Sequence, residues 1–233
     1  MLGTQQTMQA NAGRYWTGAG RSLVFLLAAS SIACLLADFY RLCPMSVFTV
    51  SIFLPALAVL SGFALVDSRR GDGQLWRSVC VGALAGLIAA AAYDGFRLPF
   101  VFSKQWGLSS WVPQMPLFKV FPGFGAMILG QPVEQAHYSR AAQALGWAYH
   151  FSNGATFGVM FVAMVGNPAR RHWAWAVVFA VGLELGMLLT PYSQVFKIAL
   201  TSRFVAVTVA AHSVFGACLG GAARWLTTAF GLR

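Results

Sequence analysis

The sequence predicts an all-α polytopic membrane protein, a bundle of about six transmembrane helices. Hydrophobic residues make up 58% of the 233 residues and charged residues only 9%, whereas a soluble domain carries about 25% charged residues. The hydrophobic residues also gather in segments close to the ~20 residues that a helix needs to cross a bilayer. These two observations exclude a cytosolic enzyme, a disordered chain and a disulfide-rich secreted domain.

Proline, glycine and charged residues mark the ends of most apolar segments, because such residues favour turns and interrupt helices. The expected spans are 22–40, 45–66, 77–99, 145–166, 172–191 and 203–226. Pro55 lies inside the second span and predicts a kink there. Tryptophans near span ends are expected to anchor the helices at the membrane interface. They are Trp76, Trp147, Trp173, Trp175 and Trp225.

The basic residues predict the orientation. The net charge of +10 comes from Lys and Arg scattered between apolar segments, so the expected partner is the lipid bilayer and not nucleic acid. With the N-terminus inside, nine of them lie on the inner side and six on the outer side, with Arg97 at the border. The Arg69-Arg70 and Arg170-Arg171 pairs both fall in short inner loops. We therefore predict a multi-pass bacterial inner-membrane protein with both termini in the cytoplasm.

One long loop interrupts the spans. We divide the chain into a cytoplasmic N-terminal segment, 1–20, and one transmembrane domain, 21–233, with an outer loop at 100–144. This loop is too rich in aromatic residues and proline for a solvated linker. Residues 116–130 are expected to lie in the headgroup plane or to dip into the membrane as a re-entrant segment, and they are the candidate lid of a site below.

After the lid segment, 132–144 is predicted to form a helix that leads into the fourth span. It carries Glu134 and His137 in ExxH spacing, which places both side chains on one helix face. This spacing alone favours an exposed helix turn over a metal site.

An internal repeat connects the last four spans. Residues 150–158 and 212–220 both read His-x-x-x-Gly-x-x-x-Gly, and the span before each carries an acid, then a glycine, then a terminating proline. This pattern predicts a parallel repeat of helices 3–4 and 5–6. The Gly-x-x-x-Gly faces allow close helix contacts, within the bundle or between copies in a homo-oligomer.

The repeat places four ionisable residues at similar depth in the outer half of the membrane: Asp94, His150, Glu184 and His212. Charged groups are costly next to lipid, so these side chains are expected to face inward and pair. As trial pairs we take His150 with Glu184, and Asp94 with His212. Further residues expected to join this cluster are Asn153, Arg97 and Asp38.

Three functions fit such a cluster. Its residues can be hydrogen-bonded glue between helices, a proton relay or ion pathway, or ligands of Zn or Fe, because two His and two carboxylates suit those metals. The sequence shows no HExxH motif, nucleophile motif or nucleotide-binding loop. We therefore predict movement of an ion or small solute, coupled to protonation of the cluster. The alternatives are a membrane-embedded metal-dependent enzyme or redox protein acting on a lipid-like substrate, and a non-catalytic assembly subunit.

Overall fold

The computed structural model describes residues 15–231. Within them 74% of the chain is helical and no strand occurs, which confirms the all-α class. The part of the expected N-terminal segment before residue 15, with Arg14, and the C-terminal Arg233 lie outside the described residues.

Four helical segments are long and apolar enough to cross a membrane. They are α2 (Gly18–Phe39), Met45–Arg70, α5 (Gln74–Val101) and α10 (Ser202–Ala229). Two further helices pack among them, α7 (Arg140–Val165) and α8 (Ala174–Leu188). The helix predicted for the fifth span, 172–191, is longer than the helix that the structure shows there. Helix α8 has 15 residues, or ~22 Å, and ends in a turn before Pro191.

The segment Met45–Arg70 is irregular near Pro55. It consists of α3 (Met45–Phe48), a π-helical turn over Thr49–Phe53 and α4 (Leu54–Arg70). The Leu54 N–H donates to the carbonyl of Thr49, five residues back. A π turn is one of the usual causes of a bent helix, and here it lies where the kink was expected.

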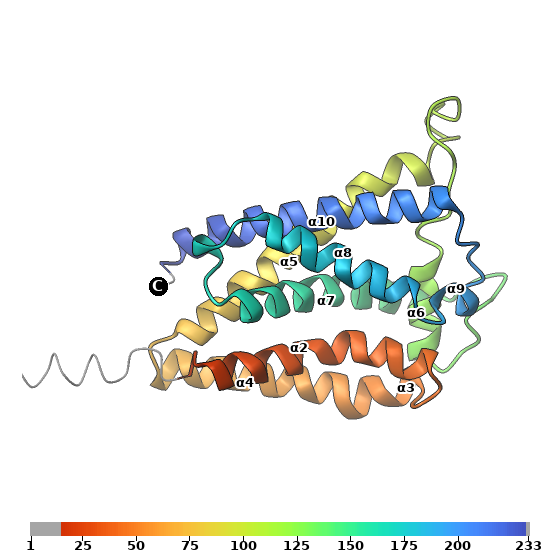
Figure 1. The fold of residues 1–233 in the computed structure, drawn as a ribbon. Helices are drawn as coiled ribbons and strands as arrows, with labels where there is room; N and C mark the ends of the chain where they lie inside the picture. The colour runs from red at the N-terminus through yellow and green to blue at the C-terminus, as the bar shows by residue number, and fades with distance from the viewer. Residues whose placement is uncertain (1–14, 232–233) are drawn as a thin grey trace, which may run out of the picture.

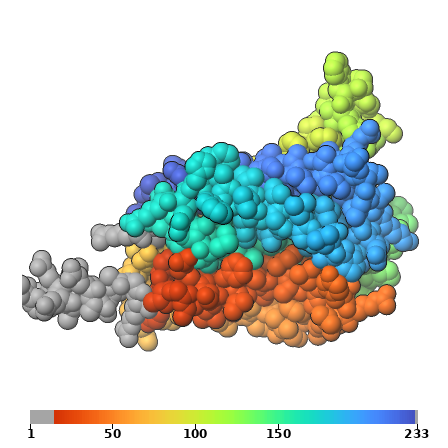
Figure 2. All heavy atoms as spheres, in the orientation of Figure 1, coloured from red at the N-terminus to blue at the C-terminus, as the bar shows by residue number. Residues whose placement is uncertain are grey.

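The helices form layers, and a cavity lies near the end of the bundle that is opposite the two described termini. Figure 1 shows α2 and α4 on one side of α7 and α8 and α10 on the other, while α5 runs obliquely from the end of α4 to α10. The beginning of α2 and the end of α10 lie at the same end of the bundle. The short helices α6 (Val120–Ile128) and α9 (Tyr192–Val195) close the opposite end. Figure 2 shows the segment after α5 projecting from the body of the protein, and Trp111 in it is 87% exposed.

Glycine faces hold the helix pairs together. An added Cβ at Gly82 in α5 would lie 2.7 Å from the Cα of Val159 in α7, and one at Gly216 in α10 would lie 2.5 Å from the Cα of Val177 in α8. The Gly-x-x-x-Gly faces are therefore occupied by helices of the same chain. In both pairs the helix with the acid packs against the helix with the histidine.

Two arginine side chains bind backbone carbonyls at one end of the bundle. At the end that holds both described termini, the Arg21 side chain donates through Nε to the carbonyl of Ala163 (2.8 Å) and through Nη2 to that of Met164 (2.6 Å). These carbonyls end α7, where a cation is favourable. Arg224 likewise donates to the carbonyl of Arg171 (2.5 Å).

The prediction of a helix over 132–144 is wrong for residues 132–139, which are not helical. Helix α7 begins only at Arg140, because Ser139 caps it and accepts from the N–H of Ala142 at 3.1 Å. Glu134 and His137 lie in non-helical chain. The Glu134 carboxylate pairs with the Lys197 ammonium, and this hydrogen bond lowers the pKa of Glu134. The pair ties the outer loop to the connection between α9 and α10.

Candidate functional site

Two acid–histidine pairs lie inside the bundle, and each joins an acid helix to the histidine helix that follows it. Asp94 Oδ2 lies 2.9 Å from His150 Nε2, and Glu184 Oε2 lies 3.4 Å from His212 Nδ1. Both carboxylates belong to buried residues. The trial pairs, His150 with Glu184 and Asp94 with His212, were wrong. The glycine contacts of α5 with α7 and of α8 with α10 decide which acid meets which histidine.

Tyr93 lies between the two pairs, and sequence reasoning missed it. Its ring centroid is 4.9 Å from that of His212 and 5.9 Å from that of His150. The only available signal was its position next to Asp94 on the same helix. The tyrosine brings both acid–histidine pairs into one group of contacting side chains.

Arg97 joins this group one turn after Asp94. Its side chain lies 3.6 Å from Asp94, measured from Nη1 to Oδ1, and its Nη2 donates to the carbonyl of Leu117. Arg97 is only 4% exposed. Its guanidinium carbon lies 4.7 to 5.2 Å from three ring centroids, a distance at which cation–π attraction operates. The rings are those of Tyr93, Phe118 and Phe121.

Two other expected members lie elsewhere. Asp38 Oδ2 accepts from the N–H of Met45 at 2.6 Å, so this carboxylate caps the first turn of α3 instead of joining the cluster. Asn153 is buried in α7, about one turn from His150, and its Oδ1 has no hydrogen-bond partner. It is not among the residues that line the cavity described next.

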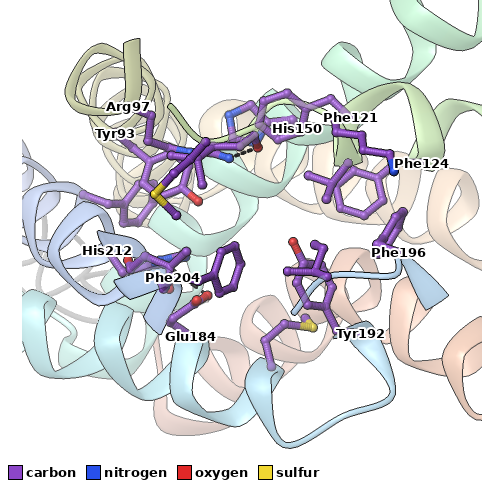
Figure 3. A pocket seen from close by; sticks show the side chains of 18 of the residues that line it. Tyr93, Arg97, Phe121, Phe124, His150, Glu184, Tyr192, Phe196, Phe204 and His212 are labelled. Carbon is purple, nitrogen blue, oxygen red and sulfur yellow. Dashed lines mark hydrogen bonds and ion pairs between the residues drawn. The ribbon is translucent and has the colours of Figure 1, made fainter. Parts of the chain in front are cut away.

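A cavity of about 410 Å³ opens beside the acid–histidine pairs. Its volume lies in the range of small-molecule sites, ~300–1,000 Å³. Figure 3 shows Arg97, Tyr93, His212 and Glu184 on one side of this hollow and Phe124, Phe196 and Tyr192 on the other. The ionisable residues that line it are Tyr93, Arg97, Lys119, His150, Glu184, Tyr192, Lys197 and His212. Burial raises the pKa of Tyr192, so its phenol stays neutral.

Helix α6 covers this cavity, as expected for the lid segment. The ring of Phe121 stacks on His150, with centroids 4.1 Å apart and an interplanar angle of 27°. Trp147 contacts Phe121 at 4.5 Å and His150 at 5.9 Å. This tryptophan, expected as an interfacial anchor, therefore packs over the site. The apolar residues of α6 are buried because they face α7 and the cavity.

The lid makes a testable prediction about access. In a variant with Cys43 replaced by serine, cysteines at Phe121 and Phe124 are expected to react slowly with a membrane-impermeant thiol reagent, because both positions are buried. A cysteine at Trp111 is the control and should react at least ~10-fold faster. Equal labelling rates at the three positions would show that α6 does not shield the cavity from the reagent.

The four residues expected as Zn or Fe ligands do not form one ligand set. Within residues 15–231, no group of three or more His, Cys, Asp or Glu side chains lies close enough to hold a metal ion. The acid–histidine pairs are instead separated by Tyr93. Two donors per pair do not fit the four-coordinate geometry of a structural zinc site or the three protein ligands of a catalytic one.

Comparison with known proteins adds no relative: no family model, no curated protein and no solved structure matches the chain.

Proposed function

We propose that this chain is a six-span protein of the bacterial inner membrane that moves a small anionic solute through the cavity, coupled to protonation of the two acid–histidine pairs. Four segments are apolar and long enough to span. Helices α7 and α8 complete the six, because both pack lengthwise against these segments. The Arg69-Arg70 and Arg170-Arg171 pairs lie at the end that holds both described termini, which supports a cytoplasmic location for that end.

The parallel repeat of helices 3–4 and 5–6 remains part of the proposal. Its support is the equivalent pairing of α5 with α7 and of α8 with α10, each through glycines and each with one acid–histidine contact. Homo-oligomerisation is a separate proposal, and a second copy would dock on other faces, since these glycines contact helices of their own chain.

The observation that carries the transport proposal is that His150, Glu184 and His212 line the same cavity as Arg97. Buried ionisable groups are costly in a membrane and commonly mark a solute or proton pathway. Histidine changes charge near physiological pH. A solute in the cavity would therefore lie next to side chains that can take up and release protons.

The sign of this change favours an anion. With His150 neutral, Asp94 (−1) and Arg97 (+1) sum to zero, and protonation of His150 makes the sum +1. Likewise the Glu184–His212 pair goes from −1 to zero. When a transport cycle protonates both histidines, the cavity becomes more positive by two charges, which would attract an anion, and loss of the two protons would release it. Tyr93 and Tyr192 are the other titratable groups facing the histidines, with Lys119 and Lys197 at the rim.

A flux assay tests this proposal. Purified protein in liposomes containing a pH-sensitive dye is exposed to chloride, phosphate or hexanesulfonate, which is permanently charged and does not cross as a neutral acid. We expect an anion-dependent uptake of protons that falls at least ~10-fold in Asp94→Asn and in Glu184→Gln. The matched control is His137→Ala, because His137 is exposed outside the cavity.

If no anion produces proton uptake above that of empty liposomes, the transport proposal is wrong. The cluster then serves to hold the helices together by hydrogen bonds, and the non-catalytic assembly subunit is the function that fits better. The apolar lining of the cavity specifically favours a second candidate, an enzyme acting on a lipid-like substrate. Against it, no serine or cysteine of the described residues lines the cavity, and the metal ligand set is incomplete.

A further inference from the structure

Two of the side-chain nitrogen atoms of Arg97 make no hydrogen bond within the protein. Arginine carries five N–H donors, and one of these reaches the carbonyl of Leu117. Its Nε and Nη1 have no hydrogen-bond partner, although the residue is buried and lines the cavity. Asp94 lies 3.6 Å away, which is an ion-pair distance but longer than a hydrogen bond. Buried donors without partners are rare and costly, so these groups point to a ligand with acceptor oxygens.

The electrostatics of the cavity select an anionic ligand. Lys119 and Lys197 lie at its exposed rim, Lys197 paired with Glu134, and Arg97 lies in its wall beside Asp94. The one acid among the lining residues, Glu184, already pairs with His212. A carboxylate or phosphate can accept two parallel hydrogen bonds from a guanidinium, which makes arginine the preferred partner of both.

The rest of the cavity suits an apolar tail. Opposite Arg97 the wall is aromatic, with Phe124 and Phe196. The lining continues along α5 to Ala90, seven residues before Arg97, and hence ~10 Å deeper along the helix. At that depth it is completed by Phe157 of α7 and Ala180 of α8. The charged end of the cavity therefore lies near the α6 end of the bundle, and the apolar end lies toward the membrane centre.

We propose that the cavity binds an amphiphile with one anionic head group, the head beside Arg97 in the cavity wall and the alkyl tail between α5, α7 and α8. The polarity of the cavity runs in the same direction as that of a lipid in the outer leaflet. The inference rests on the proposed function, since it names the class of solute that is moved. A carboxylate head and a phosphate head share the chemistry that Arg97 recognises.

Photolabelling in maltoside micelles tests the binding directly. A dodecanoate with a diazirine at its tail end is expected to label residues near Phe157 and Ala180, and unlabelled dodecanoate or dodecyl phosphate should compete. Dodecyltrimethylammonium and dodecanol should compete at least ~10-fold less well, because neither gives Arg97 an anion. Stronger competition by dodecyl phosphate would identify a phospholipid-like ligand, and stronger competition by dodecanoate a free fatty acid. Equal competition by all four compounds would overturn the proposal.

Two variants separate the head site from the tail site. Arg97→Gln is expected to weaken labelling at least ~10-fold, whereas Lys104→Gln, an exposed lysine outside the cavity, should leave it unchanged. Leu183→Trp fills the apolar part of the cavity without removing a polar group and should also reduce labelling. It keeps the test valid if Arg97→Gln does not fold. Unchanged labelling in a folded Arg97→Gln, or in Leu183→Trp, would contradict the assignment.

The outcomes for solute class and for transport are distinguishable. Labelling that depends on Arg97, in a protein without anion-coupled proton uptake, would support the amphiphile and overturn the transport function. Proton uptake with chloride, in a protein that dodecanoate does not label, would support transport and overturn the amphiphile.

Discussion

Asp94→Asn is expected to be the most damaging substitution in the site. It removes the carboxylate that contacts both His150 and Arg97, and it leaves the guanidinium of Arg97 buried without a counterion. Breaking a buried ion pair by removing one partner typically costs ~3–5 kcal/mol. We expect a loss of this size in the free energy of unfolding, measured by denaturant titration in detergent.

Double substitutions identify the partners. Arg97→Gln added to Asp94→Asn should recover part of the stability, because the uncompensated charge is gone. His150→Gln added to Asp94→Asn should cost little more than Asp94→Asn alone, since the two residues share one contact. By contrast, Asp94→Asn and Glu184→Gln belong to different pairs that are joined only through Tyr93, so their losses should depart less from additivity than those of Asp94→Asn and His150→Gln. Losses that also add for Asp94 with His150 would show that the contact contributes nothing to stability.

Gly86→Leu is expected to separate α5 from α7 and to abolish most of the folded protein. A Cβ at Gly86 would overlap the carbonyl oxygen of Gly154 and lie 2.8 Å from its carbonyl carbon, well inside the ~3.5–4.0 Å of normal contact. Backbone cannot rotate away as a side chain can, so the helices must move apart. Overpacking costs ~1–3 kcal/mol for ordinary core insertions and more where no rearrangement is available.

The matched control is Gly95→Leu in the same helix, because nothing lies within 4 Å of a Cβ at Gly95. Fluorescence-detected size exclusion and thermal unfolding in detergent should show an unchanged Gly95 variant and a destabilised or aggregated Gly86 variant. Equal stability of the two variants would show that α5 and α7 do not make this contact. Because the α5–α7 contact also sets the register of Asp94 and His150, a surviving Gly86 variant should lose the Asp94–His150 coupling.

Composition and local pattern were sufficient for the helical class and for the approximate positions of the helices. Apolar length predicts a helix because the backbone must satisfy its own hydrogen bonds in lipid, and this local requirement is readable residue by residue. The same reasoning predicted that Asp94, His150, Glu184 and His212 face inward, since the cost of a charge next to lipid does not depend on the partner. The lid was also predictable, because 116–130 is too apolar to be solvated.

Local pattern failed where the outcome depends on which hydrogen-bond partner a polar side chain finds in the folded chain. Asp38 has the composition of a cluster residue, yet it caps α3 because the turn after α2 brings the N–H of Met45 to it. The ExxH helix did not form because Ser139 caps α7 and Glu134 pairs with Lys197, 63 residues later.

The amino-acid sequence by itself determined that the chain forms apolar helices with buried acids and histidines. Only the tertiary structure decided that Asp94 meets His150, that Glu184 meets His212, and that Tyr93 lies between them. The physical reason is that helix partners and their register are set by backbone contact at the glycine faces. Many helix pairs share those faces, so no short pattern specifies which two will meet. The free donors of Arg97 follow from the same packing, because α6 and its preceding turn supply Leu117 and Phe121 but no anion.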